Sequence, residues 1–167
     1  LASGGFNANH ASRAKLVGSH RHVAIPAEVD IRPLDELVAE TGAHLARDVS
    51  QPVLWAPASV VPSSIDRSGP WPHFGDRAKP GVICLGPDGK RFANEAQIYH
   101  DFVPAMITAT GAHPEGAHCW IITDHRALRR YGLGPIGPFP VRLGPYLRAG
   151  YLKKGRTPVD LAKAMNL

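Results

Sequence analysis

The string from Gly132 to Gly137 has the G-x-G-x-x-G spacing of loops that bind the phosphates of a dinucleotide. In such sites a strand precedes the loop and a helix begins at its end, so that helical N–H groups meet the phosphate. Here Pro135 interrupts the string, a helical segment precedes it, and Pro138 and Pro140 forbid a helix after it. The sequence therefore predicts a loop rich in proline and glycine, not a dinucleotide site.

Histidine is the second residue type that could do chemistry, and the chain has nine of them. Only His10, His20 and His22 lie near one another, and the alternation of His20 and His22 is typical of an exposed strand. Zinc sites usually show tighter paired spacings, often with cysteine. We therefore expect no metal site. No G-x-S-x-G string occurs either, so no Ser-His-Asp triad can be assigned from the sequence.

The segment from Gly89 to Asp101 holds Tyr99, whose phenol is a candidate for proton transfer. The alternative interpretation makes Tyr99 a half-buried packing residue that follows a hairpin. His100 is adjacent, and we expect it to face solvent unless it assists the phenol.

Both helices and strands must position these candidate residues. Helices are predicted over 33–41, 96–110 with a break at Pro104, 125–131 and 158–165, with a weaker one over 9–18. Strands are predicted at 52–61, 81–86, 90–93 and 118–123, and long loops at 62–80 and 131–145. The Asp88-Gly89 turn should make a hairpin, and Thr157 with Asp160 should form a capping box. The fold class is α+β: a small mixed or antiparallel sheet from the segments of Val53, Gly81, Lys90 and His118, with surrounding helices.

Composition excludes several classes of protein. The 167 residues carry a net charge of +5, but the lysines and arginines are scattered, which argues against nucleic acid as a partner. No apolar run approaches the roughly 20 residues of a membrane helix, and we expect no signal peptide. Cys84 and Cys119 lie in apolar, strand-like runs, which predicts free thiols and a cytoplasmic location.

Two further strings resemble a known family. Pro80-Gly81-Val82-Ile83 followed by the segment 89–95, Gly-Lys-Arg-Phe-Ala-Asn-Glu, resembles a block of flavoproteins related to fumarate reductase, L-aspartate oxidase and 3-ketosteroid dehydrogenases. The segment 1–6 is similar to the family's turn from the FAD domain into the cap. The segments 120–124, 150–152 and 157–162 resemble the steroid dehydrogenase branch. The family's N-x-G-D-G segment is not visible, and 27–31 occupies its region.

The resemblance gives Tyr99 a role. Fumarate reductases have an Arg at this position, four residues after the Glu, and steroid dehydrogenases have a Tyr that serves proton transfer. The implied reaction removes or adds two hydrogens across a carbon–carbon bond next to a ketone, with hydride passing to flavin N5 and the proton to Tyr99. A neutral phenol suits an apolar carbonyl substrate, whereas a dicarboxylate would need cationic partners.

The resemblance also implies a division of the chain. Residues 1–6 would end the FAD-binding segment, and 7–167 would form the capping, substrate-side domain. Ser3, Gly4 and Gly5 would pass close to FAD. Leu133, Ile136 and Met106 are candidates for an apolar substrate wall or for core.

The family's main FAD-binding segments are not found in these residues. We therefore expect the FAD-binding domain of a longer parent chain as partner, and inactivity or self-association of this piece alone. The alternatives are a non-catalytic binding module of the same ancestry and a fumarate-reductase-like enzyme.

Overall fold

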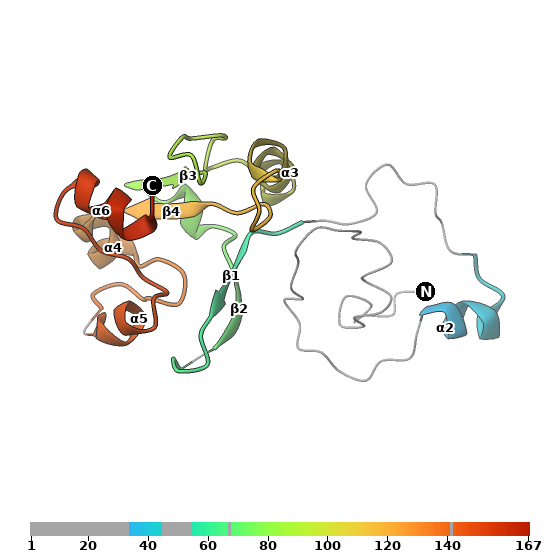
Figure 1. The fold of residues 1–167 in the computed structure, drawn as a ribbon. Helices are drawn as coiled ribbons and strands as arrows, with labels where there is room; N and C mark the ends of the chain where they lie inside the picture. Colours follow the sequence, from blue (N-terminus) through green and yellow to red (C-terminus); the bar gives the residue numbers. More distant parts are fainter. Residues whose placement is uncertain (1–33, 45–54, 67, 141) are drawn as a thin grey trace. The chain divides into compact units, whose positions relative to one another are not determined.

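The computed structural model describes residues 34–44, 55–66, 68–140 and 142–167. The chain divides into two units, Leu1–Leu54 and Trp55–Leu167. In the first unit the described element is helix α2 (Leu34–Thr41), which confirms the predicted helix and ends before Gly42 at a positive φ of 63° (Figure 1). The helix predicted over 9–18 lies outside the described residues, as do Ser3, Gly4 and Gly5.

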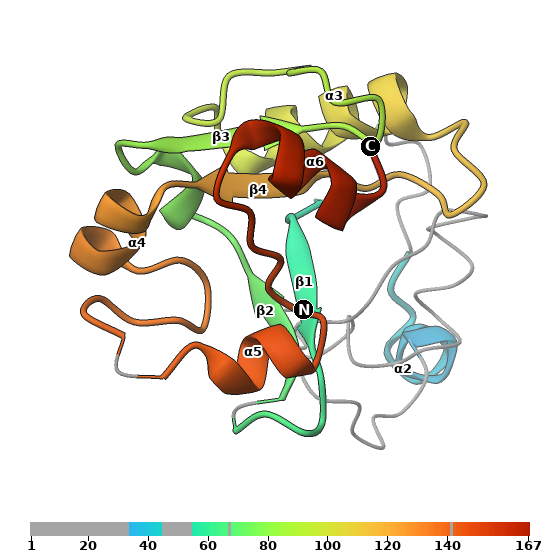
Figure 2. The same ribbon diagram turned by 60° about the vertical axis from the view of Figure 1, so that its left-hand side comes forward.

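The α+β class is confirmed in the second unit, where two small antiparallel sheets lie among helices (Figure 2). Strand β3 (Val82–Leu85) pairs with β4 (Trp120–Thr123), with Cys84 opposite Ile121. Strand β1 (Ala58–Val61) pairs with β2 (Gly69–Pro72).

The hairpin predicted after β3 is wrong in its return strand. The turn at Asp88-Gly89 exists, closed by the bond from Gly86 N to Lys90 O at 2.9 Å, but 90–93 forms no strand. The reason is chemical: the Cys84 amide donates to the Glu95 carboxylate at 2.8 Å. A side chain therefore occupies a bonding position on the edge of β3 that a return strand would use.

Segment 62–80 was predicted as a loop because of its prolines and glycines, but it contains β2 and the short 3₁₀ helix η2 (Asp76–Ala78). Proline is tolerated in β2 because a two-stranded sheet consists of edge strands, where a missing ladder donor costs little. The strand predicted over 52–61 is observed at Ala58–Val61.

Helix α3 (Tyr99–Thr110) runs through Pro104 without the predicted break. The N–H that Pro104 lacks would have bonded to a carbonyl in the first turn of the helix. The missing hydrogen bond therefore lies near the N-terminal end of α3. The helix begins at Tyr99 and not at Ala96 because Asn94 draws the preceding residues into a turn, accepting from Ala96 N through Oδ1 and from Gln97 N through its carbonyl, both at 3.0 Å.

The main core of this unit lies between β3, β4 and α3. Cys84, Phe102 and Val103 are buried at its centre. Partly buried residues pack around them: Trp55, Phe92, Ala93, Met106, Ile107, Cys119 and Ile121. Both cysteines are free thiols, as predicted.

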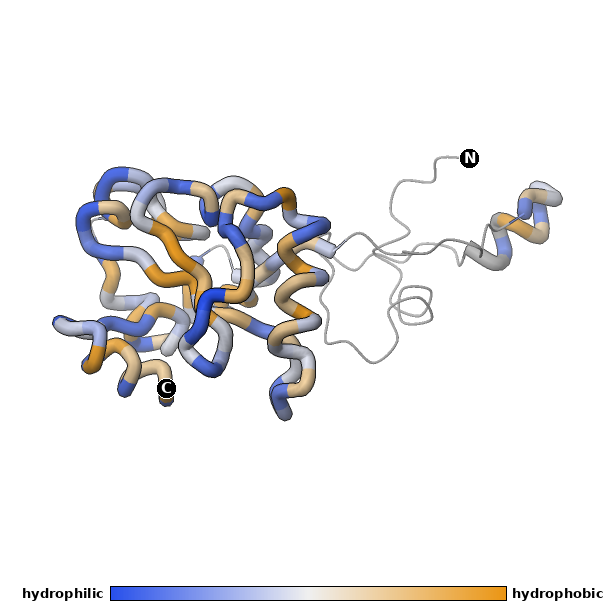
Figure 3. Tube along the Cα trace, turned by 90° about the horizontal axis from the view of Figure 1, so that it is seen from above, coloured by the Kyte–Doolittle hydropathy of each residue, from blue (hydrophilic) through white to orange (hydrophobic). Residues whose placement is uncertain are grey.

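In the described part of the chain, three short helices follow β4. Helix α4 (His125–Tyr131) begins after Asp124, whose carboxylate accepts from Ala127 N at 2.7 Å. Helix α5 (Gly144–Arg148) begins inside the segment predicted as loop. Helix α6 (Pro158–Met165) has the predicted capping box of Thr157 and Asp160. Hydropathy changes over short stretches of the trace (Figure 3), and no described helix is long and apolar enough to cross a membrane.

Candidate active site

Tyr99 is the first residue of α3 and is half-buried. Its ring centroid lies 5.2 Å from that of Phe74, which follows β2, and 5.7 Å from that of His100. Tyr99 therefore stands where the start of α3 meets the segment that leads from β2 to η2.

Arg77 fixes these two segments together. Its side chain is 1% exposed and donates to three backbone carbonyls: to His73 at 2.8 Å, Glu95 at 2.7 Å and Gln97 at 3.2 Å. The guanidinium also lies over the Phe102 ring, 4.2 Å from its centroid. A planar fork of donors suits this task, because it spans several carbonyls at once. The turn before Tyr99 is thereby held against the segment after β2.

Glu95 supports the same turn from the other side. Its buried carboxylate accepts from Cys84 N and forms a two-pronged ion pair with Arg91, at 3.0 Å from Nε and 2.6 Å from Nη2. Burial alone would raise the pKa of Glu95, but these hydrogen bonds hold it below its usual value. Glu95 thus stays ionised and fixes the edge of β3.

Four side chains form a continuous chain of hydrogen bonds, which we name the relay: Asp76, His73, Ser59 and Tyr151. Asp76 Oδ2 lies 2.6 Å from His73 Nδ1. His73 Nε2 lies 2.8 Å from Ser59 Oγ, which lies 2.6 Å from the Tyr151 hydroxyl. The residues come from η2, the end of β2, β1 and the turn after α5. The relay joins segments 92 residues apart in the sequence.

The relay has a charged end and a neutral end. Burial would raise the pKa of Asp76, but the His73 side chain and the Gly134 amide, at 3.0 Å, lower it. Burial raises the pKa of Tyr151, and the hydrogen bond to Ser59 offsets this only in part. At neutral pH Asp76 is therefore a carboxylate and Tyr151 a phenol. Among the described residues, the buried Asp76 Oδ1 has no hydrogen-bond partner.

This arrangement can pass a proton without moving its heavy atoms. With neutral His73, the proton sits on Nδ1 beside Asp76, so Ser59 donates to Nε2 and Tyr151 donates to Ser59. With the imidazolium form, Nε2 donates instead, the order of donors reverses and the Tyr151 hydroxyl is released as a donor to another group. The protonation of His73 thus decides whether Tyr151 offers a lone pair or a proton.

A comparison with protein families matches residues 1–157 to the family described as FAD binding domain. The chain belongs to this FAD-binding family. The match confirms the resemblance read from the sequence, and the cofactor of the family is FAD.

Curated relatives of this FAD-binding chain are dehydrogenases. A 4-oxocyclohex-2-ene-1-carboxylate 5-dehydrogenase of Sinomonas cyclohexanicum is 33% identical over 97% of this chain and 28% of its own length. A 3-oxosteroid 1-dehydrogenase of Mycolicibacterium smegmatis is 27% identical over 100% of this chain and 29% of its own length. The chain thus spans less than a third of these relatives. No solved structure matches it.

The G-x-G-x-x-G string does not fit FAD. It forms a closed turn in which Leu133 and Ile136 bond to each other at 2.8 and 3.1 Å. The Gly134 amide, which a phosphate would need, is bonded to Asp76. The predicted loop is confirmed, and its role is to pack on the relay: a Cβ at Gly134 would lie 2.9 Å from His73 Cε1. The described turn from Gly132 to Gly137 therefore does not form a phosphate cradle.

The predicted wall residues fall in two places. Ile136 is buried and Leu133 half-buried in the turn that packs on the relay. Met106 packs against the core of Cys84 and Phe102. Tyr99 lies at the junction braced by Arg77.

The relay is the part of the site that sequence reasoning missed. A search for G-x-S-x-G could not find it, because that motif is local in the sequence. Ser59 lies in β1 and His73 lies 14 residues later, directly after β2. The spacing of His73 and Asp76, three apart in a segment predicted as a long loop, was the available signal.

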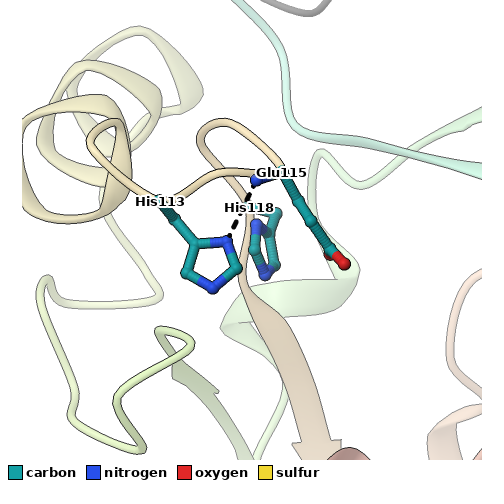
Figure 4. Close-up of side chains that lie close together, drawn as sticks. All are labelled: His113, Glu115 and His118. Carbon is teal, nitrogen blue, oxygen red and sulfur yellow. Dashed lines mark hydrogen bonds between the residues drawn. The ribbon is translucent and has the colours of Figure 1, made fainter.

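One group of metal-binding side chains also emerges from the described residues. His113, Glu115 and His118, in the connection from α3 to β4, face one another with their ligand atoms all within 4.8 Å (Figure 4). The near cluster considered from the sequence, His10, His20 and His22, lies outside the described residues.

Proposed function

We propose that the protein containing this chain is an FAD-dependent dehydrogenase that oxidises a carbon–carbon bond next to the ketone of a ring compound. The chain would be its capping, substrate-side domain, inactive by itself. The observation that carries the proposal is the relay: an Asp-His pair bonded through a serine to a half-buried phenol, in a chain whose relatives are named as dehydrogenases of oxo compounds.

The reaction divides into a hydride and a proton. The bound FAD supplies the acceptor for the hydride, which leaves the carbon β to the ketone. The proton leaves the α carbon, and we assign Tyr99 to receive it: the oxygen would act as a phenolate and become a phenol in the step. Loss of the hydride and the proton leaves a carbon–carbon double bond next to the ketone.

The relay would serve the ketone oxygen, which gains negative charge as the α proton leaves. A fixed donor at such an oxygen stabilises the transition state, and losing one typically costs about 10²–10³ in rate. Tyr151 fits this role because burial keeps it protonated and because its hydroxyl ends the relay, 2.6 Å from Ser59 Oγ. The two tyrosines thus divide the work, one as base and the other as acid.

The substrate class follows from the residue types. A phenol donor such as Tyr151 suits a carbonyl oxygen, whereas a dicarboxylate such as fumarate would call for guanidinium partners at position 99. The relatives are named for ring ketones, with and without a carboxylate. We propose a cyclic ketone as the substrate.

The test uses the full-length protein. Its visible spectrum should show bound flavin, and anaerobic addition of 3-ketosteroid or 4-oxocyclohexanecarboxylate should bleach it. Tyr99→Phe should keep the flavin and lower turnover by about 10²–10⁴. Tyr131→Phe, a half-buried tyrosine of α4, is the matched control.

Other outcomes identify the alternatives. Absence of flavin in the full-length protein would leave the non-catalytic binding module. Oxidation of pre-reduced flavin by fumarate, without any response to ketones, would favour the fumarate-reductase-like enzyme. Full turnover of Tyr99→Phe would remove Tyr99 from its role.

A further inference from the structure

The connection from α3 to β4 concentrates metal-binding side chains in a short stretch. His113, Glu115 and His118 follow the spacing H-x-E-x-x-H, and their ligand atoms all lie within 4.8 Å of one another. The two imidazole rings meet edge to face, with centroids 4.8 Å apart (Figure 4). Two imidazoles and one carboxylate form a ligand set known from zinc sites.

The backbone holds this turn in place before any ion arrives. His113 N donates to Thr110 O at 3.1 Å, and Gly116 N donates to His113 O at 2.8 Å. His118 N donates to Thr110 Oγ1 at 3.2 Å, and that hydroxyl donates to Met106 O within α3. The three ligand residues are therefore anchored to the end of a helix, which reduces the entropy that metal binding would otherwise cost.

The ring nitrogens are also oriented. His118 Nδ1 lies 2.8 Å from the Gly116 carbonyl, so Nδ1 carries the proton and Nε2 keeps its lone pair. A backbone carbonyl in this position is the usual outer partner of a metal-binding histidine. His113 Nδ1 accepts from Glu115 N through a longer contact of 3.3 Å. An ion bound at Nδ1 would replace this contact, and an ion bound at Nε2 would leave it in place.

The exposure of the three residues favours an open site. The two histidines are half-buried, and Glu115 is exposed. Within the described part of the chain, the Glu115 carboxylate forms no ion pair that would compete for it. An ion would thus have protein ligands on one side and water on the other.

We propose that His113, Glu115 and His118 bind a divalent transition-metal ion, with Zn²⁺ as the fitting occupant and water in its remaining position. Imidazole nitrogen selects Zn²⁺ and its neighbours over Mg²⁺ and Ca²⁺, which prefer oxygen. The site is separate from the proposed dehydrogenase chemistry. It lies beyond the end of α3 opposite to Tyr99, and those ends are roughly 17 Å apart at 1.5 Å per residue. The bound ion would stabilise the connection between α3 and β4.

The experiment is a Co²⁺ titration of the full-length protein after treatment with chelator. Visible d–d bands should appear at one equivalent and vanish when Zn²⁺ is added. His118→Gln should weaken Co²⁺ and Zn²⁺ binding by at least about tenfold, the loss seen even for outer-shell changes. His125→Gln, an exposed histidine at the start of α4, should bind like the unmodified protein.

A second readout covers the case of a poorly folded variant. Zn²⁺ should raise the thermal unfolding midpoint of the unmodified protein and of His125→Gln, but not that of His113→Gln or Glu115→Gln, because only a bound ion shifts the folding equilibrium. Absence of d–d bands in the unmodified protein, or equal bands in His118→Gln, would overturn the proposal.

Discussion

At the scale of single residues, the charge on Asp76 sets the direction of the relay. Its carboxylate lies 2.6 Å from His73 Nδ1 and is 11% exposed, so it holds the proton on that nitrogen and leaves Nε2 to face Ser59. A neutral amide in its place would present a donor or a weaker acceptor and would favour the wrong tautomer.

The first prediction concerns this carboxylate. Asp76→Asn in the full-length protein should lower the turnover of a ring ketone by about 100-fold or more while flavin stays bound. Asp88→Asn, in the exposed turn after β3, is the control. A loss below threefold would contradict the relay.

At the scale of elements, the turn from Gly132 to Gly137 matches the spacing of a dinucleotide-binding motif, but its role is structural: it packs on the relay. Gly134 has a φ of 57° and donates its amide to Asp76. A Cβ at this position would contact the His73 ring, so the relay packs against the space that glycine leaves. Gly137 belongs to the same turn, but a Cβ there would meet nothing within 4 Å.

The second prediction uses this contrast. Gly134→Ala should destabilise the protein by about 1–3 kcal/mol, because alanine is strained at this φ and its Cβ would push against the His73 ring. Turnover should fall with it. Gly137→Ala should change the free energy of unfolding by less than about 0.5 kcal/mol. Urea unfolding of the two variants, followed with ketone oxidation, checks both statements; equal effects would show that the relay does not need this glycine.

The same scale shows what the sequence could and could not predict. Local signals identified α6 through its capping box and α4 through Asp124, because caps act within four residues. The return strand at 90–93 was wrong because a side chain, Glu95, takes the place of a backbone partner. The relay was not predictable because its members converge from separate strands and turns only after folding.

At the scale of the whole molecule, two carboxylates with lowered pKa values, the half-buried Asp76 and the buried Glu95, link folding to pH. A group whose pKa is lower in the folded state adds stability above its unfolded pKa, and this is lost as the pH falls through the folded pKa. Asp76 and Glu95 both have this sign, despite the opposing effect of their burial.

The third prediction follows. The free energy of unfolding should be steady near neutral pH and should fall as the pH drops below about 4. Glu95→Gln should lower stability at pH 7 and flatten the acid decline, whereas Glu36→Gln, an exposed residue of α2, should do neither. Chemical denaturation across this range is the measurement. An acid decline of equal steepness in Glu95→Gln would remove Glu95 from the linkage.

The brace made by Arg77 has a consequence for how such a protein diversifies. All three of its hydrogen bonds end on main-chain carbonyls, so it recognises the path of the chain and not the identity of the side chains at 73, 95 or 97. Substitution of Phe74, whose ring lies beside that of Tyr99, can therefore alter what surrounds the phenol while Arg77 keeps the chain in place. The surroundings of Tyr99 can thus change by substitution without loss of the hydrogen bonds that hold the backbone.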